Sequence, residues 1–191
     1  VICGFTLSNF PYSRSAYQTK NKGGHDAVVL KMTSDGTSLI YSTHIGGSKS
    51  DYAYDLELDN DGLPYVVGYT LSDDFPVVKP CHDHIHNSDS EAFVIKIATK
   101  AVDLVYSTLV GNKFETIARE IELMDDQLYI SGVMNSPYLP GDGRGYDTVN
   151  DGCSDGYVVQ LSKNLSEIEY STYYGGPSSE HVWGLHVKNN T

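Results

Sequence analysis

The chain is poor in basic residues, in cysteine and in long apolar runs. Its 191 residues include 13 Lys and Arg against 25 Asp and Glu, a formal charge of −12. Nucleic-acid backbones and anionic membrane surfaces require clustered basic residues, so this balance argues against both as partners. Three cysteines are too few for a disulfide-rich scaffold. No apolar run approaches the roughly 18 residues of a membrane-spanning helix, so we expect no membrane span.

Helical periodicity and the common catalytic motifs are also missing. No stretch combines a sustained i, i+3, i+4 apolar pattern with capping residues, so we expect essentially no helix. The sequence contains no G-x-S-x-G elbow, no H-E-x-x-H pair and no phosphate-binding loop. We therefore expect a protein that is not an enzyme and that needs no cofactor.

What the chain does contain is a threefold internal repeat. The segments DAVVLKM, EAFVIKI and DGYVVQL begin 65 and then 64 residues apart, at Asp26, Glu91 and Asp155. A Tyr-Ser-Thr triplet and a following glycine recur with the same spacing, first at Tyr41 and Gly46. The period predicts a single repeat region, with units at about residues 1–50, 51–115 and 116–179 and a final strand at 180–191.

Each unit is predicted to form four short strands. In the middle unit they are expected at residues 54–59, 65–70, 92–97 and 104–109, which are rich in Val, Ile, Tyr and Thr. The third strand of each unit is apolar on both alternating faces, which favours burial on both sides. Tandem four-stranded sheets of this kind are the blades of a β-propeller. We predict an all-β segment of about three four-stranded antiparallel blades; a β-sandwich competes, but needs no strict period.

The phase of the repeat suggests an incomplete ring. The chain opens on a second strand, at residues 1–6, and its last predicted strand, at 182–187, is a first strand. Three blades are fewer than the four to eight that usually close a propeller. We therefore expect a fragment of a larger propeller, or a chain that self-associates; two copies would supply six blades. The expected structural partners are neighbouring blades of the same longer chain or a second copy.

These motifs resemble the SBBP repeat, a β-propeller repeat family named for seven-bladed propellers. The matching stretches are DAVVLKMTSDGTSLIYSTHIGG (26–47), DYAYDLELDNDGLPYVVGYTLSDDFP (51–76) and AYQT (16–19), and the likeness covers nearly the whole chain. The later copies drift: Asn112 replaces a glycine, and the loop at 134–154 keeps little of the pattern. The resemblance implies a secreted or surface-attached, mostly bacterial protein without established catalytic residues. The implied function is a non-catalytic scaffold or binding module, extracellular or at the cell surface.

Long connections join the second and third strands of each unit, at about residues 5–24, 71–90 and 134–154. Loops of this length are uncommon unless they are functional or packed by their own residues. We expect them to form the contact surface for a protein or glycan partner. In a lectin-like alternative, loop tyrosines such as Tyr12, Tyr17 and Tyr146 would stack on sugar rings.

The middle loop carries the run CHDHIH, which starts at Cys81. Side chains at i, i+2 and i+4 of an extended backbone project to one side, so His82, His84 and His86 would converge there on one metal ion. Imidazole suits zinc, copper or nickel, and a second alternative is therefore a metal-binding propeller enzyme. The competing and favoured interpretation is a solvated polar loop, because the spacing matches no standard zinc signature and the other units have nothing equivalent.

Two further features are left open by the sequence. Glu57, Glu122 and His186 occupy matched positions of the predicted first strands and would line a central channel. Clustered carboxylates there would attract a cation or an amine, although partly wet strands also tolerate polar side chains. Cys81 and Cys153 both lie in long loops, and the sequence does not test whether their distance permits a disulfide.

Overall fold

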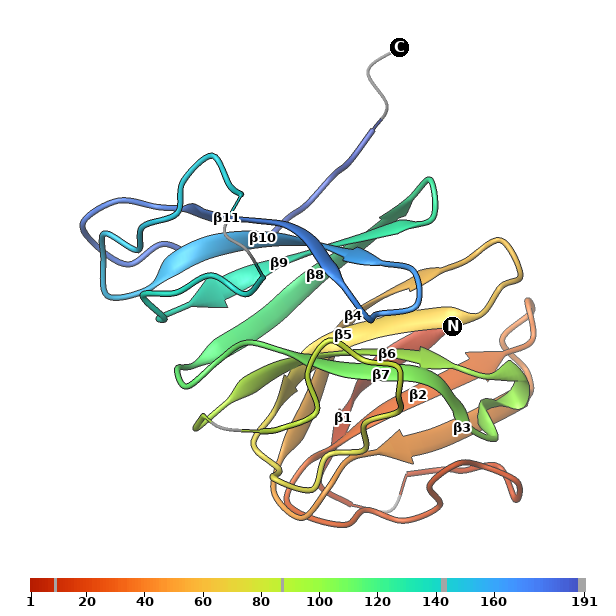
Figure 1. The fold of residues 1–191 in the computed structure, drawn as a ribbon. Coiled ribbons are helices and arrows are strands. Elements are labelled where there is room, and N and C mark those ends of the chain that lie inside the picture. Colours follow the sequence, from red (N-terminus) through yellow and green to blue (C-terminus); the bar gives the residue numbers. More distant parts are fainter. Residues whose placement is uncertain (9, 87, 142–143, 189–191) are drawn as a thin grey trace.

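The computed structural model describes the chain except residues 9, 87, 142–143 and 189–191. Regular structure in the described residues is β-strand, apart from one 3₁₀ turn at Thr99–Ala101. The strands form three antiparallel sheets (Figure 1), so the all-β prediction is confirmed. No helix in the described part of the chain is long and apolar enough to cross a membrane.

The strands of each sheet are consecutive in the sequence, and each sheet is a meander of neighbouring strands. The first sheet has the order β1-β2-β3, with β1 at Ile2–Thr6, β2 at Asp26–Met32 and β3 at Leu39–Ile45. The second contains β4 (Asp51–Leu58), β5 (Pro64–Thr70), β6 (Glu91–Ile97) and β7 (Leu104–Val110). The third contains β8 (Thr116–Met124), β9 (Gln127–Met134), β10 (Asp155–Ser162) and β11 (Ile168–Tyr174).

The first and last predicted strands have different outcomes. β1 pairs with β2 as β5 pairs with β6, so the first sheet does begin at the second-strand position. Residues 182–188, in contrast, have no strand pairing, and residues 189–191 lie outside the described residues. A strand is defined by a ladder of backbone hydrogen bonds, and no described strand forms such a ladder with this segment. The prediction of a final strand there is therefore not met within the described residues.

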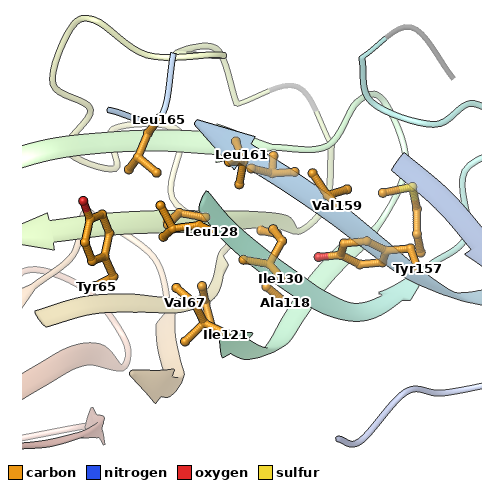
Figure 2. Close-up of a cluster of buried hydrophobic side chains, with 14 of the residues drawn as sticks. Tyr65, Val67, Ala118, Ile121, Leu128, Ile130, Tyr157, Val159, Leu161 and Leu165 are labelled. Atoms are coloured by element: carbon orange, nitrogen blue, oxygen red, sulfur yellow. The ribbon is translucent and has the colours of Figure 1, made fainter. Parts of the chain in front are cut away.

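The middle sheet is buried on both faces. One core cluster joins it to the first sheet, through Phe93 and Ile95 of β6 packed with Val29 of β2. A second cluster joins it to the third sheet, through Val94 of β6 packed with Ile130 of β9; Figure 2 shows side chains of this cluster. Alternate residues of β6 thus enter different cores, which explains why this strand is apolar on both faces.

Two glycines allow the first and second strands of a sheet to approach closely. The β4–β5 ladder shifts register between Ala53 and Asp55. At this point a Cβ on Gly68 would lie 1.8 Å from the carbonyl oxygen of Tyr52. The third sheet repeats the arrangement, with a Cβ on Gly132 at 1.9 Å from the carbonyl oxygen of Ile117. Only glycine fits, because no real Cβ tolerates such a distance from a backbone atom.

Gly132→Ala is therefore expected to lower the free energy of unfolding by at least about 2 kcal/mol, since the new methyl group forces β8 away from β9. Urea denaturation followed by circular dichroism measures the change. Gly176→Ala is the matched control, because a Cβ there meets no atom within 4 Å. Equal stability of the two variants would contradict this account of the close approach.

Candidate functional site

The recurring Tyr-Ser-Thr triplet anchors each long loop on the last strand of its sheet. The threonine hydroxyls of the three triplets accept hydrogen bonds from loop N–H groups: Thr43 from Gln18 (3.0 Å), Thr108 from Asp83 (3.0 Å) and Thr172 from Asp147 (2.9 Å). The serine hydroxyls of the second and third triplets donate to proline carbonyl oxygens of the loops, at 2.6 and 2.7 Å. The repeated triplet thus fixes how each loop returns across its sheet.

The histidine run lies in the second of these loops, and the loop is not an extended strand. The Asp83 carboxylate accepts hydrogen bonds from the N–H groups of His84 (2.6 Å) and Ile85 (3.0 Å), which forms a turn. The prediction of a common side assumes an extended chain, and these side-chain hydrogen bonds replace regular strand pairing at His84 and Ile85.

The three histidines accordingly have separate surroundings. The His86 ring nitrogens lie 3.1 Å from the Asp73 carboxylate and 3.2 Å from the Thr70 carbonyl oxygen. His84 is exposed, and His82 lines a groove described below. No group of three His, Cys, Asp or Glu side chains in the described ranges is placed to hold a metal ion. The metal-enzyme alternative thus finds no converging ligand set there.

The groove beside His82 lies between loops of the second and third units. Its volume is ≈ 380 Å³. Its lining includes Phe114 and Tyr138, residues that are 40% and 69% exposed. The Asn112 side chain forms part of the lining and donates a hydrogen bond to the Tyr138 carbonyl oxygen (2.7 Å). Leu139 continues the apolar surface.

Burial lowers the pKa of the His82 imidazole, although the nearby Asp83 carboxylate opposes the shift. The ring is therefore neutral at pH 7, when one nitrogen donates and the other accepts a hydrogen bond. The groove combines two largely exposed aromatic residues with an amide, a neutral imidazole and the cationic Lys113, a lining suited to a polar ligand with an apolar face.

The equivalent junction between the first and second units is closed. Asp74 occupies there the repeat position of Tyr138. Its carboxylate accepts hydrogen bonds from the N–H (2.7 Å) and the hydroxyl (2.9 Å) of Ser48. A Cβ on Gly47 would lie 2.4 Å from the same carboxylate, so Asp74 fills the space between the loops. At the second junction Tyr138, which is largely exposed, stands in place of this aspartate, and Asn112 stands in place of Gly47.

The sequence alone did not identify this groove, and the loop tyrosines that it did identify lie in different surroundings. Tyr17 is half-buried and packs against the core of the first two sheets, while Tyr12 is exposed. Tyr146 stands at the repeat position of His82 and is 91% exposed. It lines a second hollow together with Tyr174. A comparison of the repeat units could have pointed to the groove, because the third unit has Tyr138 at the position where the second unit has Asp74.

The matched polar positions of the first strands do come together. The Glu122 carboxylate lies 3.3 Å from a ring nitrogen of His186. Burial raises the pKa of Glu57, and repulsion from Glu122 and Asp55 adds to the shift. These carboxylates form a negative surface on the first strands, but no converging metal-ligand set.

The three cysteines form no disulfide. Cys3, Cys81 and Cys153 are all free, so the Cys81–Cys153 pairing is not formed. Burial, together with the Asp55 carboxylate, raises the pKa of Cys3 to about 11, and burial also raises that of Cys81. Both thiols stay protonated at neutral pH and are poor nucleophiles.

No protein-family model and no curated protein matches the sequence, so functional assignment depends on this geometry.

Buried carboxylates lie where the loops enter the sheets. A Cβ on Gly46 would lie 2.6 Å from a carboxylate oxygen of Asp51 and 2.9 Å from the Cγ of Asp26, which explains the glycine after the first triplet. Gly175 packs in the same way on Asp155. Burial raises the pKa of all three aspartates.

The protein is therefore expected to become more stable as the pH falls from neutrality towards the ordinary pKa of aspartate, about 4, because each raised pKa makes the folded protein take up protons before the unfolded chain does. Thermal unfolding at a series of pH values measures this dependence. Asp26→Asn removes one contributing group and is expected to flatten the curve, while the exposed turn variant Asp61→Asn serves as control. A midpoint that falls steadily over this pH range would contradict the prediction.

Proposed function

We propose that the chain is a segment of a β-propeller of the SBBP repeat type and serves as a non-catalytic binding module outside the cell or at its surface. Three observations support the fold: the 64-residue period, the meander order of each sheet and the packing of successive sheets through shared cores. The first strands β4 and β8 also lie side by side, and β4 contacts the second strand β1 on its other side. The location rests on the resemblance alone.

The observation that carries a binding function is the groove between the second and third units. The side chains on the sheet faces are buried in the cores, so residues that bind a ligand are expected in the loops. There the Tyr138 and Phe114 rings stay exposed, although burial of aromatic rings is strongly favourable. A bound ligand would cover this apolar surface.

A glycan is the ligand that this lining favours. The apolar C–H face of a sugar ring packs on an aromatic ring, and its hydroxyl groups both donate and accept hydrogen bonds. The rings of Tyr138 and Phe114 supply the first contact, and the Asn112 amide and the neutral His82 imidazole supply the second. The lectin-like function is therefore the more specific form of the proposal.

A glycan array followed by isothermal titration calorimetry tests the proposal. Tyr138→Ala is expected to weaken binding at least tenfold, the loss of about 1.4 kcal/mol of stacking and apolar contact. Tyr138→Asp copies the residue of the closed junction and is expected to weaken it as much. Tyr12→Ala removes an exposed tyrosine that does not line the groove and should leave affinity unchanged.

Thermal melting of each variant separates loss of binding from loss of folding. Wild-type protein that binds no glycan, or binding that survives Tyr138→Ala, would overturn the glycan assignment. Binding of a protein partner that depends on Tyr138 would instead retain the groove and change its ligand.

A further inference from the structure

The groove between the second and third units carries a positive charge, although the chain as a whole is strongly acidic. Lys113 belongs to its lining, and no Asp or Glu of the described residues does. The hollow beside Tyr146, in contrast, is lined by the carboxylates Asp147 and Glu180. A lining without carboxylates is therefore a local property of the groove, and its charge favours an anionic ligand.

The closed junction between the first and second units shows how the fold pairs charged and polar groups at this place. Lys49 forms an ion pair there with Asp73 of the facing loop (3.0 Å). Its neighbour Ser48 donates two hydrogen bonds to Asp74 of the same loop. The two aspartates thus supply the carboxylates that the lysine and the serine require.

The open junction between the second and third units keeps a lysine but lacks both carboxylates. The repeat places Pro137 and Tyr138 where the closed junction has its two aspartates. Lys113 stands at the repeat position of Ser48. It is exposed, and no residue in the described part of the chain pairs with its ammonium group or accepts a hydrogen bond from it. The facing loop therefore gives this lysine no carboxylate.

Two described carboxylates close in sequence to the lining residues have other partners. Asp83 accepts hydrogen bonds from the N–H groups of His84 and Ile85. Glu115 accepts one from the side chain of Asn135 (3.4 Å) and lines a different hollow. Neither carboxylate pairs with Lys113, so its charge is available to a ligand.

We infer that the ligand of the groove is a glycan that carries a carboxylate, either a uronic acid or a sialic acid, and that Lys113 binds this carboxylate. The inference rests on the proposed glycan-binding function and narrows it to acidic sugars. Tyr138 and Phe114 offer the aromatic surface on which the sugar ring packs, and Lys113 belongs to the same lining. A hydrogen bond between an ammonium group and a carboxylate is roughly twice as strong as one between neutral groups. The ligand thus brings the carboxylate that the facing loop supplies at the closed junction.

Isothermal titration calorimetry with two matched pairs of sugars tests the inference. One pair is a galacturonic acid trisaccharide and its methyl ester, and the other is sialyllactose and lactose. Wild type is expected to bind the carboxylated member of at least one pair about tenfold more tightly than the neutral member. The pair that shows this preference distinguishes a uronic acid from a sialic acid. Added sodium chloride should reduce the preference and leave the affinity for the neutral sugar unchanged.

Variants of the lysine test its role. Lys113→Gln is expected to abolish the preference, because no cation then faces the carboxylate, and to leave the affinity for the neutral sugar unchanged. Lys113→Arg keeps the positive charge and should retain the preference. Lys49→Gln is the matched control, because it removes the same charge from the closed junction, where the lysine pairs with Asp73. Thermal melting should find all three variants folded.

The possible failures are distinguishable. Neutral sugars that bind as tightly as their carboxylated partners would overturn this inference and leave the glycan-binding function in place. A preference for the carboxylated sugar that survives Lys113→Gln would also overturn it. Wild-type protein that binds no glycan of either kind on the array would overturn the proposed function and this inference together.

Discussion

Burial of the middle sheet on both of its faces is the constraint on which the rest of the structure depends. Every residue of β6 is buried, and successive side chains enter the core with the first sheet or the core with the third. A single four-stranded sheet has no second layer of its own and needs a neighbour on each face. Each sheet is therefore stabilised by the apolar core that it shares with a neighbouring sheet.

The glycines that recur in each unit are required by the close packing of strands and loops. Gly68 and Gly132 let a first-strand carbonyl oxygen approach the second strand. Gly46 and Gly175 leave room for buried carboxylates where the loops enter the sheets. Once these positions are accounted for by the fold, the departures from the repeat become informative. Tyr138 in place of Asp74 opens a groove that the neighbouring junction keeps closed.

Much of the fold could be predicted because each strand is marked by a local run of β-branched and aromatic residues that recurs with the repeat period. The second strand of the middle unit was predicted at residues 65–70 and lies at Pro64–Thr70. The candidate site could be predicted far less well. The three histidines were placed by strand alternation, but hydrogen bonds from two N–H groups to the Asp83 side chain bend the loop and separate them. A groove between two loops has no signature in either loop alone.

The sequence by itself determined the all-β class, the threefold period and the burial of the middle unit's third strand on both faces, because these properties depend on which residue types alternate and recur. Tertiary structure alone decided which loops face each other and where an aromatic ring stays exposed. Those outcomes depend on the separation of atoms that are distant in the chain.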